Sequence, residues 1–379
     1  MANVTVYFDH NATTPIKHRV LEEMLPFLSG SYANPSSIHS QGRIARNAIN
    51  IAREQVADSI NAHPSQVIFT SGGTEANNLA IKGTLRGMAL GAITCSAIEH
   101  PSVRDVVRYF DGATRNSVLT VDAMGVVVES DLKRRCEQER QLLVSIMLAN
   151  NETGVIQDIE RLAGITRSFG HIVHTDAVQA LGKIPLNFVA LGVHLMTLSA
   201  HKIYGPKGIG ALIYDKALDI EPVIHGGGQE KNLRSGTENV AAIVGFGKAA
   251  EIAKANLEKN QQHLVRLQQY FESRLRQVSG AVLFSASANR LPNTVFFSLP
   301  GIDGETLLMA LDEYDIAVTS GSACASKSEF ASHVLLAMGV DESIARNAIR
   351  VSFGLQNTEA EINEFFGVLT TLGVQAAKA

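Results

Sequence analysis

The sequence predicts an α/β protein with a large domain, built on a mixed but mostly parallel sheet flanked by helices, and a smaller α+β domain. Three observations support this fold class. Short apolar segments typical of buried strands alternate with helical periodicities as far as residue 214. Shorter strands and helices follow a long helical stretch in the last third of the chain. The chain has 379 residues, 45% hydrophobic and 18% charged, which is enough for two domains and a large core.

Composition excludes several classes of function. The formal net charge of −4 gives no electrostatic reason to expect direct binding to nucleic acid or to an anionic membrane. The first residues lack a signal-peptide pattern, and no apolar run approaches the length of about 18 residues that a spanning helix needs. We therefore expect a cytoplasmic protein. Its three cysteines are too few and too scattered for a disulfide framework or a structural zinc site, so no metal site is expected.

The elements of the large domain follow from periodicity, taken in chain order. Alternating apolar residues predict a short strand over residues 4–8, and Pro15, after a polar loop, suits the first turn of a helix ending near residue 27. Apolar residues at helical spacing predict an amphipathic helix over 43–61, and Pro101 is placed to start another helix. Further strands are expected at 67–70, 92–98, 142–149, 171–175, 193–198 and 209–214.

The second part of the chain changes character at residue 225. A long polar loop over 225–239 is more often functional than idle in a compact domain. A helical stretch follows, to about residue 278. Beyond it we expect strands at 294–298, 316–319 and 348–353, and a helix at 305–311.

Lys202 is the first candidate catalytic residue. It stands between an apolar strand and the glycine- and proline-rich turn at 204–208. A lysine held there is partly desolvated, which would lower its pKa and make its amine a nucleophile toward aldehydes. A solvated loop lysine and a phosphate-loop lysine are the alternatives. The second is disfavoured because the phosphate-loop pattern of spaced glycines before Lys-Ser/Thr is absent.

Two other strand ends carry candidate site residues. The turn Ser71-Gly72-Gly73 leads into Thr74 at a helix N-terminus, where free N–H groups and the helix dipole favour a phosphate; an ordinary capped turn is the alternative. His100 follows the strand at 92–98, and ligands of open parallel sheets bind beyond strand carboxyl ends. A satisfied surface histidine is the alternative for that residue.

Cys324 is a candidate reactive thiol. It lies in the small, polar segment 319–328, which has almost nothing to bury, so reaction chemistry explains a thiol there better than packing does. An incidental exposed thiol is the alternative. Cys95 and Cys136 are expected to be packing residues instead.

Together these residues fit pyridoxal phosphate better than any other cofactor. That cofactor requires a lysine for its aldehyde, an acid beside its ring nitrogen and a cup for its phosphate. Asp176, after the strand at 171–175, supplies the acid, and His100 can stack on the ring. Gln179 can donate a hydrogen bond to the ring oxygen.

Six motifs give the chain its resemblance to a known family: SGGTEANN at 71–78, ANNETG at 149–154, HTDAVQ at 174–179, SAHKIYGPKG at 199–208, RSGTEN at 234–239 and SGSAC at 320–324. They resemble those of the cysteine desulfurases that feed bacterial iron–sulfur cluster assembly. The resemblance runs from Phe8 to about Gly354. The chain departs from the family pattern mainly beside the cysteine, at Ala325, Lys327 and residues 329–331.

The resemblance implies a homodimer of the type I pyridoxal phosphate fold. It implies a large domain over residues 16–255 and a small domain from 1–15 and 256–379, with a catalytic cysteine loop at about 319–333. Lys202 would bond the cofactor aldehyde and Cys324 would be the nucleophile. The family pattern places further roles on Gly73, Thr74, Ser199 and His201 (phosphate), Thr237 (phosphate of the partner subunit), and Asn151 and Arg350 (ring and substrate carboxylate).

The activity implied is conversion of L-cysteine to L-alanine. Lys202 would remove the Cα proton, His100 would assist proton transfer at the sulfur, and Cys324 would take that sulfur as a persulfide. An acceptor protein, either an iron–sulfur scaffold or a relay for thio-modification of tRNA or DNA, would receive it. The alternatives are a selenocysteine lyase or aminotransferase on the same fold, and an inactive homologue acting as a scaffold.

Overall fold

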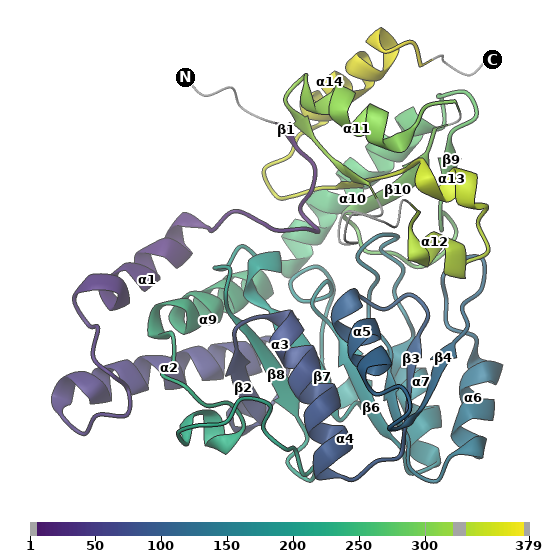
Figure 1. Ribbon diagram of the computed structural model, residues 1–379. Helices are drawn as coiled ribbons and strands as arrows, with labels where there is room; N and C mark the ends of the chain where they lie inside the picture. The colour runs from purple at the N-terminus through teal and green to yellow at the C-terminus, as the bar shows by residue number, and fades with distance from the viewer. Residues whose placement is uncertain (1–5, 300, 321–330, 375–379) are drawn as a thin grey trace.

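The computed structural model describes residues 6–299, 301–320 and 331–374 (Figure 1). Its strands are β1 (Val6–Tyr7), β2 (Val67–Thr70), β3 (Ala92–Ser96), β4 (Arg115–Leu119), β5 (Leu143–Ser145), β6 (Ile172–Asp176), β7 (Leu195–Ser199), β8 (Gly210–Tyr214), β9 (Val282–Leu283), β10 (Thr294–Ser298), β11 (Ile316–Ala317), β12 (Thr319–Ser320) and β13 (Ala348–Ser352).

The helices alternate with these strands. They are α1 (His18–Ser29), α2 (Ser40–Ser59), α3 (Gly73–Asn78), α4 (Thr84–Gly87), α5 (Pro101–Tyr109), α6 (Glu129–Gln138), α7 (Ile159–Ser168), α8 (Phe188–Leu191), α9 (Val240–Ala255), α10 (Leu257–Leu275), α11 (Gly304–Asp312), α12 (His333–Ala337), α13 (Glu342–Arg346) and α14 (Glu359–Thr371). Short helical turns are η1 (Pro64–Gln66), η2 (Leu79–Gly83), η3 (Ala200–Lys202) and η4 (Gln229–Asn232).

A seven-stranded sheet in the order β2-β8-β7-β6-β5-β3-β4 forms the larger body of the molecule. The four pairings from β7 to β4 are parallel, and β8 pairs antiparallel with both β7 and β2. The sheet is therefore mixed but mostly parallel, as the sequence predicts. Because its parallel strands point the same way, their carboxyl ends meet at one edge.

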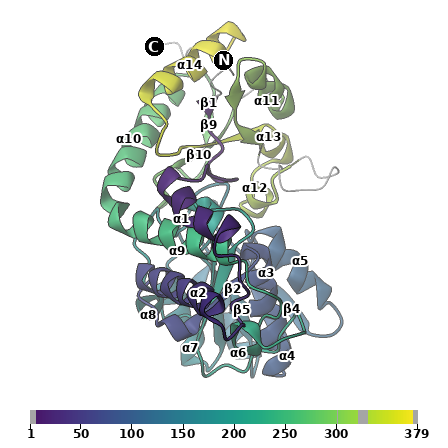
Figure 2. The same cartoon turned by 90° about the vertical axis from the view of Figure 1, so that its left-hand side faces the viewer.

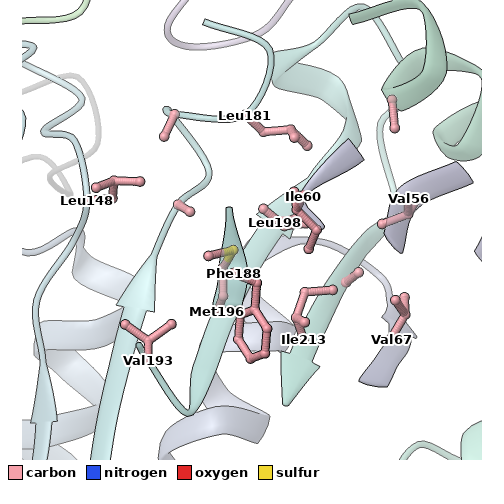
Figure 3. Packing of buried hydrophobic residues seen from close by; sticks show 14 of the residues in the cluster. Val56, Ile60, Val67, Leu148, Leu181, Phe188, Val193, Met196, Leu198 and Ile213 are labelled. Carbon is pink, nitrogen blue, oxygen red and sulfur yellow. The ribbon is translucent and has the colours of Figure 1, made fainter. Parts of the chain in front are cut away.

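Helices cover both faces of this sheet. One apolar cluster joins α1, α2, α6, α7, α8 and α9 to the sheet, and another joins α3, α4 and α5 to its opposite face. Figure 3 shows the first cluster, where Met196 and Leu198 of β7 lie near Ile213 of β8 and near Ile60, the C-cap of α2. Burial on both faces explains why the central strands are continuous apolar runs.

A second, smaller body packs above the strand ends. Its four-stranded antiparallel sheet has the order β12-β13-β10-β9, and β1 pairs with β11 beside it. Figures 1 and 2 show α10, α11 and α14 around these strands, so that the start of the chain lies beside its last third. This arrangement is compatible with the predicted domain boundary near residue 255, which stays a proposal.

Several predicted boundaries differ from the structure. The first helix begins at His18 rather than Pro15, and the strand expected over 142–149 is only three residues long. The helical stretch after residue 239 divides at Asn256, which has a non-helical backbone. The strand expected over 316–319 is two short strands, because β11 pairs with β1 and β12 with β13.

A buried hydrogen bond ties the two bodies together at the sheet edge. The hydroxyl of Ser332, the N-cap of α12, donates to the Glu152 carboxylate, and both side chains are buried. Burial raises the pKa of Glu152 to about 7, although the Ser332 hydrogen bond and the charges of Arg350 and Arg104 lower it. A carboxyl group that holds its proton near neutral pH makes stability depend on pH.

Glu152→Gln should remove this dependence. As pH rises from 4.5 to about 7, the unfolded chain releases a proton that the native carboxyl keeps, so wild-type stability falls by about 3 kcal/mol. Urea unfolding should therefore show the variant gaining stability relative to wild type across that window and no further gain above it. The exposed Glu54→Gln is the control for the loss of one carboxyl group. A flat difference for Glu152→Gln would contradict the argument.

Candidate active site

A cavity of about 450 Å³ lies at the carboxyl ends of the parallel strands. Ten of the predicted site residues line it: Gly73, Thr74, His100, Asn151, Asp176, Gln179, Ser199, His201, Lys202 and Arg350. They come from segments spread over nearly 280 residues of sequence. The shared direction of the strands in the large sheet brings most of them together, and Arg350 reaches the cavity from the second sheet. Asp9, Asn11, Asn77 and Ser102, which sequence reasoning did not select, also line the cavity.

Lys202 ends the short turn η3 directly after β7 and is half-buried. Its Nζ donates to the carbonyl oxygens of Asn11, at 2.5 Å, and Ala12, at 2.7 Å. These acceptors belong to the loop after β1, so the N-terminal segment fixes where the lysine amine lies. The amine is thereby held at the wall of the cavity rather than projecting into solvent.

Asp176 is the last residue of β6 and is only 5% exposed. Its Oδ1 accepts from the backbone N–H of Val178 at 3.0 Å, and its Oδ2 accepts from Nδ2 of Asn77 at 2.7 Å. A buried carboxylate needs such donors because burial without them is costly. The two donors fix the carboxylate, and its side of the cavity suits a protonated ring nitrogen.

His100 is the N-cap of α5, and Pro101 is the first residue of that helix, as predicted. Its Nδ1 accepts from the backbone N–H of Ser102 at 3.1 Å and lies 2.8 Å from the Ser102 hydroxyl. Burial lowers the pKa of His100, while the negative charge of Asp176 raises it and Lys202 lowers it. His100 therefore faces the cavity as a neutral ring at physiological pH.

The four residues predicted to hold a phosphate line two adjoining cavities. Gly73, Thr74, Ser199 and His201 border both the main cavity and a neighbouring one of about 370 Å³. Within the described part of the chain, the buried Oγ of Ser199 has no hydrogen-bond partner. Burial, together with Lys202 and Lys207, lowers the pKa of His201 to about 4. An anion at this junction would give Ser199 an acceptor and meet the first N–H groups of α3.

Arg350, in the central strand β13 of the second sheet, reaches the cavity from above. Its side chain donates to Asp9 Oδ1 at 2.6 Å and to the carbonyl of Asn151 at 3.0 Å. Its buried Nε finds no acceptor among the residues that the structure describes. The guanidinium is therefore oriented but keeps donor capacity, which suits recognition of a carboxylate.

A second buried lysine lies beside Gln179. Lys183 Nζ donates to the side-chain oxygens of Gln179, at 2.7 Å, and Asn11, at 2.9 Å, and Gln179 Nε2 donates to the Asn11 carbonyl at 2.9 Å. Burial, with repulsion from Lys202 and Arg350, holds the pKa of Lys183 well below its usual value. Gln179 keeps one amide hydrogen for a ligand.

These features fit pyridoxal phosphate. The buried carboxylate of Asp176, the held amine of Lys202 and the unpartnered hydroxyl of Ser199 supply the acid, the amine and part of the phosphate cup that this cofactor needs. Gly73 keeps the cup open, because a Cβ there would lie 3.0 Å from Val178 Cγ2.

Two predicted residues are not part of this assembly. Thr237 is exposed and does not line either cavity of its own chain. Cys324 lies outside the described residues. Cys95 and Cys136 are buried, as expected for packing residues.

The residues that were missed carried only weak signals in the sequence. Asn77 follows Gly73 by one helical turn, and Ser102 follows His100 by two residues. Their spacing from these predicted site residues was the signal that could have identified them. Asp9 and Asn11 belong to a polar run after a strand, which indicated a loop but not its place beside Lys202. Nothing in the sequence indicated that Lys183 would be buried.

Comparisons with known proteins identify the family and the fold of the chain. The family model for aminotransferase class-V matches residues 6–365. A cysteine desulfurase IscS from Dictyoglomus turgidum is 44% identical over 368 residues, covering 96% of this chain and 93% of that protein. The X-ray structure of a NifS-like protein from Rickettsia africae has a TM-score of 0.91 at 39% identity, covering 98% of this chain and 99% of that one. A structure of SspA in complex with cysteine has a TM-score of 0.81 at 34% identity, covering 92% and 99%.

Ser199→Ala should weaken pyridoxal phosphate binding without weakening the fold. Loss of a hydrogen bond to a charged phosphate should reduce the affinity for pyridoxal phosphate about tenfold. Removal of a buried hydroxyl without a partner should leave the free energy of unfolding unchanged or slightly higher. Cofactor titration of the apoprotein and urea unfolding measure the two effects.

Ser145→Ala is the matched control for this test. The Ser145 hydroxyl bonds His174 at 2.8 Å inside the sheet, so its loss should lower stability by about 1 kcal/mol and leave cofactor affinity unchanged. Equal effects of the two variants on affinity would rule out a phosphate contact by Ser199.

Proposed function

The chain belongs to the aminotransferase class-V family and is a pyridoxal-phosphate-dependent cysteine desulfurase, and from this premise we propose how its own residues divide the work. The observation that carries the proposal is the single cavity that gathers Lys202, Asp176, His100 and the four candidate phosphate residues. A half-buried lysine and a buried carboxylate that face one cavity are typical of a functional site.

The cofactor is held at both ends in this proposal. Lys202 would bond its aldehyde, Asp176 would pair with its ring nitrogen, and Gly73, Thr74, Ser199 and His201 would bind its phosphate. His100 would stack on its ring, and Asn151 and Gln179 would hold the ring in place. When bound, pyridoxal phosphate supplies a ring that accepts the charge left when the substrate Cα loses a proton.

L-Cysteine is oriented by its carboxylate. Arg350 presents a planar guanidinium whose direction Asp9 and the Asn151 carbonyl have already set. A prealigned arginine loses less freedom on binding than a mobile one. The amino group of the substrate is thereby directed toward Lys202. The Lys202 amine, once released from the cofactor aldehyde, would take the Cα proton.

The sulfur then moves to Cys324. As thiolate, Cys324 attacks the substrate sulfur, so that the bond between Cβ and sulfur breaks and a sulfur–sulfur bond forms. Cβ receives a proton, L-alanine leaves, and Cys324 carries the persulfide. No external oxidant is needed, because the electron pair of the cleaved bond stays with Cβ, which is reduced as the two sulfur atoms are oxidised to a persulfide.

An acceptor protein takes the persulfide sulfur. We propose that it is a cytoplasmic iron–sulfur scaffold or a relay for thio-modification of tRNA or DNA. Neither nucleic acid nor a membrane is proposed as a direct partner. Within the described residues, no helix is long and apolar enough to cross a bilayer.

A homodimer completes the site in this proposal. Leu21, Leu25 and Leu28 leave one face of α1 apolar and exposed, and Tyr32 and Ile38 in the following loop are 82% and 88% exposed. Figure 2 shows α1 and α2 together on one side of the molecule. An apolar surface of this kind marks an interaction site. Thr237, exposed in its own chain, then serves the phosphate of the partner subunit.

Cys324→Ser should separate substrate binding from sulfur transfer. Addition of L-cysteine should still change the visible absorption of the cofactor, because Lys202, Asp176 and Arg350 are intact, but persulfide and sulfide should fall to background. Cys136→Ala is the control and should keep both, since Cys136 is buried in the large body. Sulfide release at the wild-type rate from Cys324→Ser would exclude its role as the nucleophile.

Mixed dimers test whether Thr237 acts across the interface. Lys202→Ala and Thr237→Ala chains are each inactive or weakened alone, but a dimer of one with the other has one site with Lys202 and the partner's threonine both intact. Co-refolding should therefore restore up to half of the wild-type activity per dimer. Activity no higher than that of Thr237→Ala homodimers would contradict a contribution in trans.

A further inference from the structure

Asn77 joins the two residues proposed to lie on different sides of the cofactor ring. It is 1% exposed, and its Nδ2 donates to both Asp176 Oδ2, at 2.7 Å, and Ser102 Oγ, at 2.9 Å. Ser102 in turn contacts His100 Nδ1 through its hydroxyl and its backbone N–H. Four side chains from α3, α5, its N-cap and β6 therefore form one buried chain of hydrogen bonds.

The direction of every bond in this chain follows from one charge. A carboxylate only accepts, so the amide of Asn77 must turn Nδ2 toward Asp176. The other hydrogen of Nδ2 makes Ser102 Oγ an acceptor and so turns the hydroxyl hydrogen away from Asn77. That hydrogen points instead to His100 Nδ1, which already accepts from the backbone N–H of Ser102. The buried Oδ1 of Asn77 has no hydrogen-bond partner in the described structure, so the carbonyl does not set this orientation.

We propose that Asn77 is a positioning residue that uses the negative charge of Asp176 to hold the Ser102 hydroxyl as a donor, and so keeps His100 neutral with its proton on Nε2. The role of this proton rests on the proposed function. His100 donates it from Nε2 to the substrate sulfur and does not act as the base for the substrate thiol. A different group must then take the thiol proton of L-cysteine.

The groups around His100 are consistent with this assignment. Protonation of Nδ1 would require both Ser102 donors to turn away, and burial opposes the charged ring as well. Asp176, from β6, and Asp105, from α5, favour the imidazolium, whereas Lys202, after β7, and Arg104, from α5, oppose it.

Histidine-labelled holoprotein tests the proposal by nitrogen NMR over a pH series, with His100→Gln used to assign the signal. In the wild type, the His100 Nδ1 should be unprotonated and Nε2 protonated. Asn77→Leu should raise the pKa of His100 by roughly one unit, the equivalent of one hydrogen bond, because the Ser102 hydroxyl can then turn and accept. Ser102→Ala should raise it similarly, and Ser102→Thr should restore the wild-type value.

The cofactor absorption gives a second readout. Asn77→Leu should also shift the pH midpoint of the visible band, because Asp176 loses a donor, whereas Ser102→Ala should leave it unchanged. If Asn77→Leu does not fold, the smaller Asn77→Ala serves instead, since its methyl group cannot donate to either neighbour.

A His100 pKa and tautomer unchanged in the Asn77 variant, or a band shift in Ser102→Ala as large as in Asn77→Leu, would overturn the relay. The NMR readout needs no substrate. Absence of desulfurase activity in the wild type would therefore contradict the proposed function and leave the relay intact. An unchanged His100 in the Asn77 variant would overturn the relay and leave the proposed function intact.

Discussion

A single buried carboxylate, that of Asp176, constrains the rest of the site. It lies at the end of a central strand, where an ionised group is costly unless donors surround it. The backbone N–H of Val178 and the amide of Asn77 supply two donors, and we propose that the cavity side of the carboxylate pairs with a cationic ring nitrogen. Because a carboxylate cannot donate, its charge also fixes the orientation of Asn77 and, through Ser102, of His100.

The N-terminal loop balances the positive side of the same cavity. Burial lowers the pKa of Lys183, and the nearby charges of Lys202 and Arg350 lower it further. Carbonyl oxygens of Asn11 and Ala12 hold Lys202, and the carboxylate of Asp9 holds Arg350. The loop after β1 thus orders the cationic groups although it carries none of the predicted catalytic residues.

Patterns of burial explain which elements could be predicted from the sequence. The strands at 67–70 and 294–298 match to the residue, because each is buried throughout and bounded by turn residues. Predicted strand ends are wrong where the apolar run in the sequence and the strand pairing in the structure end at different residues. The apolar run at 142–149 continues beyond β5, because Ile146, Met147 and Leu148 pack in apolar clusters outside the strand ladder. The antiparallel placement of β8 depends on its partners, which no local pattern records.

The sequence by itself determined the chemical groups of the site, since lysine, aspartate, histidine and the glycine turn stand at strand ends whose common direction follows from the alternation of strands and helices. It also determined the family, through motifs spread over most of the chain. Tertiary structure alone decided which neighbours control those groups. Asn77, Ser102, Asp9 and Asn11 act through hydrogen bonds between segments up to 341 residues apart, and the energy of a hydrogen bond depends on distance and direction in space rather than on separation along the chain.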